Sequence, residues 1–372
     1  MSRNIKARLN NLSQRRTGDS AIALDAVLAK AAGLSVTLES YQEKTSREYT
    51  RYALGSMQEV GPAYTKICLG EADRVGEQLK AGLAAKSISI ETRVQGSVAC
   101  NVHIKKHSDV DLLALDDRFF TYDTEGPKAL SGTYQNRYAR SAKECIQELR
   151  SAAITALRER FPAVTVTPGS KAIGMVGGSL QRKVDVVPSH WHHTSAYQST
   201  GKEWERGVYI LDSQNDAMIK NLPFVHIEKI SSRDSVCSGA LRKAIRLCKN
   251  VKADAEAEGT VIALSSYDIV ATMWHADLQN LILAGQFDLA ILSETNRHLR
   301  FLAENHAYAR ILTVPDDSRK IFDTDEKLKG LNALSAEISD LAIEVAIEQG
   351  RGMRPQGWDA IEKVLKESRQ LA

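Results

Sequence analysis

The first half of the chain mixes two periods of hydrophobic and polar positions. Apolar side chains recur at every second position over residues 87–95, which is typical of a half-buried strand. Apolar residues at helical spacing predict helices over 59–85 and 136–161, and Pro162 ends the second of them. Further strands are expected at 109–115, 163–167, 171–176, 181–188 and 207–211.

The second half of the chain follows the helical period almost throughout. After about residue 225 the strand pattern nearly disappears. Helices are expected at 228–258, 266–283, 286–308, 325–348 and 356–370. The most apolar stretch, "VIALSSYDIVATMWHADLQNLILAG", is interrupted by Asp268, His275 and Asp277, so we do not expect it to span a membrane. This change from a mixed strand and helix pattern to a helical pattern predicts an α+β protein whose domains cover residues 1–225 and 226–372.

Composition agrees with two globular domains. The chain has 372 residues, of which 43% are hydrophobic and 26% charged. A net charge of +3 is too small to indicate a nucleic-acid partner by itself, but it is compatible with an anionic ligand in a cleft. Five cysteines without CxxC spacing argue against disulfides and a cysteine zinc site, so we expect reduced, buried thiols. The N-terminus has no apolar secretory segment, and a cytoplasmic protein is expected.

The stretch "GSVACNVHIKKHSDVD", from Gly96 to Asp111, carries candidate chemistry. Asp109 and Asp111 are two positions apart in a predicted strand, so they share a face at about 6.6 to 6.8 Å along the chain. Two such carboxylates repel unless a cation such as Mg²⁺, which prefers oxygen ligands, neutralises them. Gly96 allows close approach of a ligand to the backbone, and the Ser97 N–H and hydroxyl are suited to phosphate oxygens. The stretch therefore predicts a triphosphate at the turn and a metal at the aspartates.

Asp185 is the candidate for a third carboxylate. A site for two ions, about 3.5 to 4 Å apart, needs more carboxylate than two aspartates conveniently provide. Asp185 stands between Val184 and Val186 in "RKVDVVPS", so its side chain opposes the apolar face of a strand that we place beside residues 109–115. Its expected role is to help lower the pKa of an attacking hydroxyl, or to accept its proton, while pyrophosphate is displaced in line. A lone pair of aspartates or a lone Gly-Ser is more often a surface feature, but their combination favours a nucleotidyltransferase.

These motifs support a resemblance. "QGSVACNVHIKKHSDVDLL" followed by "KVDVVPS" resembles the polymerase-β-type nucleotidyltransferase superfamily, and within it the cGAS/DncV-like group of bacterial cyclic oligonucleotide synthases. The resemblance implies a nucleotidyltransferase core with a mixed β-sheet over 1–225, N-terminal helices included, and a helical domain over 226–372 that completes the nucleotide-binding cleft. It also implies two Mg²⁺ or Mn²⁺ ions held by Asp109, Asp111 and Asp185.

The helical half strengthens the narrower resemblance. "LRKAIRLCKNVKADAEAEGTVIALSSYDIVATMWHAD" is similar to a segment of animal cyclic GMP-AMP synthase and its bacterial relatives in which a lysine and a Ser-Ser-Tyr contact the donor nucleotide. Carried over, Lys249 and Ser266 would touch the triphosphate and Tyr267 would stack on a base. The resemblance covers most of residues 59–276.

The dense histidines of "SHWHH" depart from the animal enzyme. His190, His192 and His193 have no cysteine nearby in the sequence to form its zinc-bearing insertion, so activation by double-stranded DNA is not expected. We interpret them as a polar loop beside the third aspartate, with substrate contact or adventitious metal as the alternative. Residues 105–107, "KKH", are interpreted as a solvated turn, with a triphosphate-facing role as the alternative.

Three functions stay open at this stage. The resemblance implies an enzyme that joins nucleoside triphosphates, ATP among them, into a cyclic di- or trinucleotide second messenger for bacterial anti-phage (CBASS) signalling. A separate effector protein would read the product, a regulatory protein would be a further partner, and no membrane would be involved. The alternatives are an enzyme of the same chemistry that modifies a tRNA, an antibiotic or a protein, and a non-catalytic nucleotide or RNA sensor.

Overall fold

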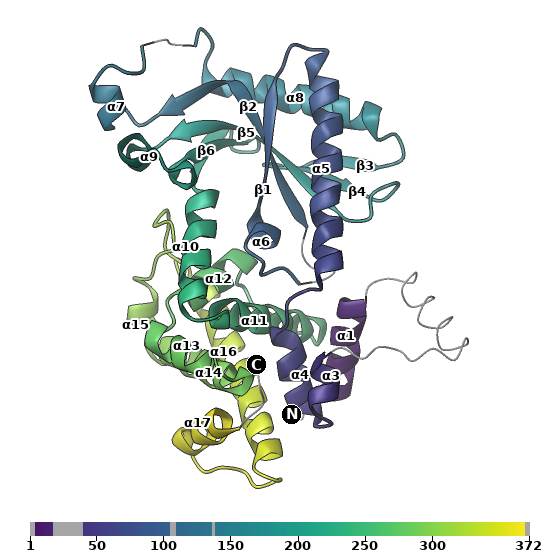
Figure 1. Cartoon of the computed structure of the whole chain (residues 1–372), viewed down its shortest axis with the longest axis vertical. Helices are drawn as coiled ribbons and strands as arrows, with labels where there is room; N and C mark the ends of the chain where they lie inside the picture. The colour runs from purple at the N-terminus through teal and green to yellow at the C-terminus, as the bar shows by residue number, and fades with distance from the viewer. Residues whose placement is uncertain (1–3, 18–39, 105–108, 136–137, 369–372) are drawn as a thin grey trace. The chain divides into compact units, whose positions relative to one another are not determined.

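The computed structural model describes residues 4–17, 40–104, 109–135 and 138–368. The described chain forms two compact units (Figure 1). The first, here the sheet unit, contains the described residues of 61–100 and 108–229. The second, here the helical unit, is assembled from those of 1–60, 101–107 and 230–372.

A mixed sheet organises the sheet unit, as the resemblance implies. Its central path is β1 (Ile90–Gln95), β2 (Val110–Tyr122), β5 (Val184–His193), β4 (Ile173–Val176) and β3 (Thr165–Pro168). β6 (Gly207–Asp212) pairs with β5, and β7 (Ala217–Asn221), which the sequence analysis did not predict, pairs with β6. The β2–β5 pair is parallel and the others are antiparallel.

Two long helices cover one face of this sheet. α5 (Pro62–Ala84) contacts β1 and β2, α8 (Ala142–Arg160) contacts β3, β5 and β6, and the two helices contact each other (Figure 1). α8 starts at residue 142 because the Ser141 hydroxyl accepts from the Glu144 N–H in a capping box. Leu79 of α5, Leu149 of α8 and Leu113 of β2 are completely buried in the resulting core. Short helices complete the unit: α6 (Gly96–Ala99), α7 (Pro127–Leu130), α9 (Ser195–Thr200) and the 3₁₀ helix η1 (Glu203–Glu205).

The helical unit is built around α4 (Glu48–Met57), α11 (Ala240–Ala257), α14 (Asp288–Glu304) and α16 (Asp325–Gln349), which contact one another. The other helices within it are α1 (Ile5–Thr17), α3 (Ser40–Lys44), α12 (Ser266–Trp274), α13 (Leu278–Ala284), α15 (His306–Ala309) and α17 (Trp358–Glu367). α10 (Pro223–Val236) spans the point where the chain passes from one unit to the other.

Three predicted helices are each divided in the structure. The helix expected at 286–308 ends as α14 at Glu304, and the short α15 begins at His306. The helix expected at 228–258 is interrupted by Ser238 and Gly239, whose φ angles of 53° and 86° lie in the left-handed region, so α10 and α11 are separate. The helix expected at 266–283 ends at Trp274, and Asp277 then caps α13 by accepting from the Asn280 N–H at 2.8 Å. The sequence pattern missed these breaks because both flanking segments keep helical spacing.

The N-terminal helix belongs with the helical unit. Arg15 donates to both oxygens of Asp254 at 2.7 and 2.6 Å, and the Tyr52 hydroxyl donates to the same carboxylate at 2.6 Å. Arg8 is paired with Glu258 and Glu337. The compact units therefore differ in their boundaries from the single division at residue 225.

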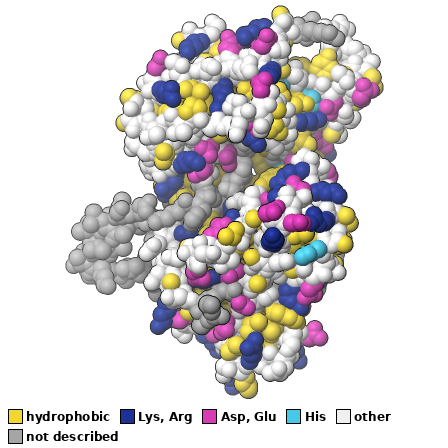
Figure 2. Space-filling model, turned by 180° about the vertical axis from the view of Figure 1, so that it is seen from behind, with side chains coloured by type: hydrophobic (Ala, Val, Ile, Leu, Met, Phe, Trp, Pro, Cys, Tyr) yellow, Lys and Arg dark blue, Asp and Glu magenta, His cyan; other side chains and the backbone are white. Residues whose placement is uncertain are grey.

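Side-chain burial agrees with two expectations. All five cysteines are buried and lie outside disulfides, in agreement with the expected reduced thiols. No helix among the described residues has the length and apolar character needed to cross a membrane. On the face drawn in Figure 2, basic and acidic side chains are intermixed over the surface, in keeping with the small net charge.

Candidate active site

The sheet brings Asp111 and Asp185 directly opposite each other. In the parallel pairing of β2 and β5 these two residues are register partners. Residues paired across adjacent strands point to the same face of a sheet, and Asp109, two positions before Asp111, lies immediately before β2. The predicted adjacency of the two strands is confirmed.

The Gly-Ser turn reaches the same place from the other side of β2. Gln95, the last residue of β1, is the register partner of Asp111, and Gly96 follows it with a φ of 73°. A Cβ atom at Gly96 would collide with the Asp111 carboxylate. Glycine is therefore required here both by the backbone conformation and by the close approach of an acidic side chain. Ser97 is half-buried in α6, directly after this turn.

A lysine that the sequence analysis did not single out bridges two of the aspartates. The Lys183 ammonium lies 2.5 Å from Asp109 Oδ2 and 3.2 Å from Asp185 Oδ2. The hydrogen bond that Lys183 donates to Asp109 raises the pKa of Lys183, so the ammonium form is favoured. Lys183 immediately precedes β5, and Asp185 is the second residue of that strand. Their spacing of two positions could have indicated from the sequence that both side chains share one face of the strand.

The carboxylates suit a hard divalent cation. Asp109 and Asp185 already share one positive charge, and Asp111 adds carboxylate oxygens in register with Asp185. These are the oxygen ligands that Mg²⁺ and Mn²⁺ accept. Among the described residues, no three His, Cys, Asp or Glu side chains lie close enough together to form a metal-ligand group.

The three residues inferred from the second resemblance lie in the helical unit. Lys249 is 4% exposed, and its ammonium donates to the Val102 carbonyl at 2.9 Å. Ser266 is the first residue of α12, whose N-cap is Ser265. The Tyr267 hydroxyl donates to Asp316 at 2.9 Å. Contact of Lys249, Ser266 and Tyr267 with a nucleotide stays a prediction.

The Tyr267 ring has a cationic neighbour. The Arg319 guanidinium lies over it at 5.3 Å from the ring centroid, and it also donates to Asp268 at 2.7 Å. Asp268 in turn accepts from the N–H and the hydroxyl of Ser265, so the start of α12 and the Arg319 side chain are tied together. Sequence reasoning missed Arg319 because it lies about fifty positions further along the chain.

The histidine cluster is not the polar loop that we expected beside Asp185. His190, His192 and His193 are buried and continue β5, so they lie at its end, whereas Asp185 lies at its start. The strand runs through Pro188 because β5 pairs with β4 up to Val186 and with β6 only from Ser189. The missing N–H of the proline thus falls between two partners, where no ladder bond is lost on that side.

The histidines have structural partners there. His192 lies 2.9 Å from the Thr121 hydroxyl and 2.9 Å from Asp123, while His193 stacks on Phe120 and lies 3.0 Å from the Tyr134 hydroxyl. Burial lowers the pKa of His193 to about 4, so the ring is neutral at physiological pH. Residues 105–107, for which a solvated turn or a triphosphate contact was considered, lie outside the described residues.

Comparison with known proteins gives relatives over most of the chain. No protein-family model matches. A cyclic dinucleotide synthase CdnE from Yersinia aleksiciae is 43% identical over 299 residues, covering 80% of this chain and 77% of the relative. A c-di-GMP synthase from a Lachnospiraceae bacterium is 25% identical over 356 residues, covering 90% of this chain and 96% of the relative.

Solved structures show the same fold. The STING-associated CdnE c-di-GMP synthase from Flavobacteriaceae sp. superposes with a TM-score of 0.71. It is 21% identical, and the match covers 92% of this chain and 98% of that one. This likeness agrees with the expected α+β nucleotidyltransferase fold.

Proposed function

The chain belongs to the CdnE cyclic dinucleotide synthases, and from this membership we propose that Asp109, Asp111 and Asp185 form its metal-dependent catalytic centre. It is a nucleotidyltransferase that joins nucleoside triphosphates into a cyclic product. The observation that carries the proposal for the site is the register pairing of Asp111 with Asp185, beside the glycine turn at Gly96.

The three aspartates would hold the metal. Their carboxylate oxygens fit Mg²⁺ or Mn²⁺, and the three carboxylates together with the triphosphate would offset the charge of two ions. A bound divalent ion would offset negative charge on the transferring phosphate and lower the pKa of a bound hydroxyl. Gly96 and Ser97 would receive the triphosphate through main-chain and hydroxyl hydrogen bonds, since the turn leaves no side chain at Gly96.

The reaction is an in-line displacement that occurs twice. The ribose hydroxyl of the acceptor forms a bond to the α-phosphorus of the donor, and the bond from that phosphorus to the bridging oxygen breaks, so that pyrophosphate leaves. Asp185 is the residue that we assign to the acceptor hydroxyl, whose proton it accepts, because it is the carboxylate contributed by the neighbouring strand. A second transfer in the reverse sense closes the ring and releases a second pyrophosphate.

Lys183 is assigned the role of internal counter-ion before metal and nucleotide bind. Its ammonium offsets the repulsion between Asp109 and Asp185. Lys183 is 43% exposed along its side chain, so its flexible stem has room to turn toward solvent when a divalent ion takes its place. Lys249 and Ser266 would contact the triphosphate, and Tyr267 would stack on a base, as the resemblance implies.

The product would act as a signal. One structural relative is a STING-associated synthase, and a separate effector that reads a cyclic dinucleotide would complete such a system. We place this signalling in bacterial anti-phage defence and in the cytoplasm, with a further regulatory protein as a possible partner and without activation by nucleic acid.

A reaction without any added acceptor tests the proposed function. The full chain is incubated with the four ribonucleoside triphosphates and Mg²⁺ or Mn²⁺, the mixture is treated with phosphatase, and the products are identified by mass spectrometry. We expect pyrophosphate release before the phosphatase treatment and a phosphatase-resistant cyclic nucleotide after it, both abolished when EDTA is present during the reaction. Nucleotide transfer only after a tRNA, an antibiotic or a protein is added would support the acceptor-modifying alternative, and nucleotide binding without turnover would support a sensor.

A further inference from the structure

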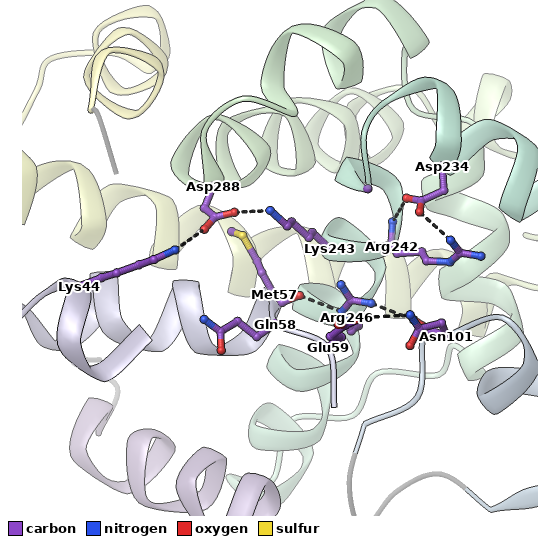
Figure 3. Close-up of a pocket in the computed structure, with 11 residues that line it drawn as sticks. Lys44, Met57, Gln58, Glu59, Asn101, Asp234, Arg242, Lys243, Arg246 and Asp288 are labelled. Carbon is purple, nitrogen blue, oxygen red and sulfur yellow. Dashed lines mark hydrogen bonds and ion pairs between the residues drawn. The ribbon is translucent and has the colours of Figure 1, made fainter. Parts of the chain in front are cut away.

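A polar cavity lies within the helical unit, and none of the three candidate catalytic aspartates lines it. Its volume is about 730 Å³, within the range of about 300 to 1,000 Å³ typical of sites for small molecules. It is lined by the C-terminal end of α4, by Asn101 and by residues of α10, α11 and α14 (Figure 3). The sequence analysis assigned no function to any of its charged residues.

Two ammonium groups in this cavity share a single carboxylate. Lys243 lies 2.8 Å from Asp288 Oδ1, and Lys44 lies 3.7 Å from Asp288 Oδ2. Figure 3 shows the two lysines reaching Asp288 from opposite sides. Asp288 is only 5% exposed, so the two ammonium groups meet at one buried carboxylate.

A third cation has its own partner. Arg242 donates to Asp234 Oδ2 at 2.8 Å, and the Arg242 main-chain N–H donates to the other oxygen of the same carboxylate at 2.9 Å. Asp234 is 4% exposed. The Arg242–Asp234 ion pair therefore adds no net charge to the cavity.

The fourth cation, Arg246, is buried with no carboxylate bound to it. Its Nε donates to the Met57 carbonyl and its Nη1 to the Asn101 carbonyl, both at 2.8 Å, and Arg246 is 5% exposed. Among the described residues no carboxylate is hydrogen-bonded to this guanidinium. Glu59 lines the same cavity, but its side chain accepts from the Asn101 amide at 3.0 Å. Burial lowers the pKa of Arg246 to about 10, which reflects the cost of leaving this charge poorly solvated.

We propose that this cavity binds a small molecule bearing a phosphate or polyphosphate group. Four cations and three carboxylates line it, and within the described chain the Arg246 guanidinium is hydrogen-bonded only to carbonyl oxygens, so a bound anion would give this buried cation a counter-charge. Guanidinium and ammonium groups are the protein groups that bind phosphate most strongly, and Lys243 and Arg246 lie almost one turn apart on α11. Phosphate oxygens would be held between these two side chains.

Arg246 connects the cavity with the chain segment that leads to the aspartates. It holds the Asn101 carbonyl, and Lys249, almost one turn further along α11, holds the next carbonyl, that of Val102. This segment directly follows α6, which begins at Gly96, and it precedes Asp109 in the chain. An anion that draws Arg246 away from Asn101 would alter the support of that segment, so the site is suited to regulation.

Calorimetric titration with inorganic pyrophosphate tests the proposal. The full chain is titrated in EDTA, so that metal-dependent capture at the aspartates does not contribute. We expect a saturable site that Lys243→Met weakens by more than about tenfold, because the ammonium nearest Asp288 is lost. Arg246→Lys, which keeps the charge but loses the planar set of donors, is the second variant and should also weaken binding.

Lys252→Met is the matched control. Lys252 is on the same helix and pairs with Glu256 at 3.3 Å, but it does not line the cavity. Pyrophosphate affinity should be unchanged in this variant. Equal affinity in wild type, Lys243→Met and Arg246→Lys would place the bound pyrophosphate elsewhere and overturn the proposal, as would the absence of saturable binding to the wild type.

Discussion

Asp111 and Asp185 are register partners across the parallel strands β2 and β5, and Asp111 is at the same time the partner of Gln95, the residue before Gly96. Backbone pairing alone therefore brings the glycine turn and two carboxylates to one place on the sheet. Substitutions that change only the charge of these side chains should leave that pairing intact.

Removal of Lys183 should increase metal affinity. In Lys183→Met the two carboxylates lose the ammonium that lies 2.5 Å from Asp109 and 3.2 Å from Asp185, so a divalent ion no longer competes with it. We expect Mn²⁺ to bind about threefold or more tightly without nucleotide, a modest gain because the ion pair is partly exposed. Electron paramagnetic resonance of free Mn²⁺ measures this directly.

The control for this variant is Lys80→Met. Lys80 is also in the sheet unit and is paired with Glu77 at 2.9 Å on α5, so the same charge is lost elsewhere. Mn²⁺ affinity should not change. If Lys183→Met bound Mn²⁺ no more tightly than Lys80→Met, the assigned role of counter-ion would be wrong.

Lys249 should contribute to stability as well as to any nucleotide contact. Lys249→Met removes the donor to the Val102 carbonyl, and Val102 is completely buried. A lost hydrogen bond from a charged donor costs about 1.5 to 3 kcal/mol, so the free energy of unfolding in urea should fall by that order. Lys252→Met, whose ion pair is nearer the surface, should lose less than about 0.5 kcal/mol. An unaltered free energy of unfolding in Lys249→Met would contradict the supporting role of this lysine.

Two variants at Tyr267 should distinguish the contribution of ring stacking from that of the hydroxyl hydrogen bond. Tyr267→Phe keeps the ring and loses the hydroxyl that donates to Asp316, so stability should fall by about 1 kcal/mol while nucleotide affinity changes little. Tyr267→Ala also loses the ring, and stacking is worth about 1 to 3 kcal/mol per base. Titration with a non-hydrolysable ATP analogue should show the larger loss only for the alanine variant. Similar affinities for the alanine and phenylalanine variants would refute the stacking role.

His298 should make the protein less stable in mild acid. Burial lowers its pKa to about 4, and its Nε2 lies 2.9 Å from the Thr272 carbonyl, to which the neutral ring donates. Below the ordinary histidine pKa of about 6.5 the unfolded chain gains a proton that the folded chain does not accept until about pH 4. This contribution to stability is therefore complete above about pH 6.5 and declines by up to about 1.4 kcal/mol per pH unit as the pH falls toward 4.

The pH dependence can be assigned with two variants. His298→Gln keeps an amide donor for Thr272 but cannot titrate, so its urea midpoint should vary less between pH 7 and pH 5. His306→Gln, at an exposed position, should retain the wild-type dependence. An identical slope in His298→Gln and wild type would exclude His298 as the source.

The part of the site that could be predicted from the sequence depends on the alternation of apolar and polar residues within single strands. Asp109, Asp111 and Asp185 could be placed on adjacent strands because valines alternate with them, and the Gly-Ser turn follows a strand of the same period. Lys183 is also separated from Asp185 by one valine, but the sequence alone did not show that its ammonium would pair with Asp109 and Asp185. These features depend on residues close together in the chain.

Other features depend on contacts between distant segments. β5 continues through Pro188 only because its neighbour changes from β4 to β6 at that point, and the sequence contains no mark of that exchange. Arg246 bonds to carbonyls at residues 57 and 101, so the charged cavity follows from tertiary packing and not from any motif. Ser238 and Gly239 divide a helix whose flanks both keep the helical period.

The most direct test of the catalytic centre compares turnover with folding in Asp111→Asn and Asp185→Asn. Pyrophosphate release and cyclic product are measured at saturating Mg²⁺, alongside the melting temperature and the affinity for a non-hydrolysable ATP analogue. We expect each variant to keep the wild-type fold, because backbone pairing places both residues, and to lose more than about 100-fold in turnover. Asp185→Asn should change donor affinity only a few-fold, since its assigned role concerns the acceptor hydroxyl. Near-normal turnover in either folded variant would show that the catalytic carboxylates lie elsewhere.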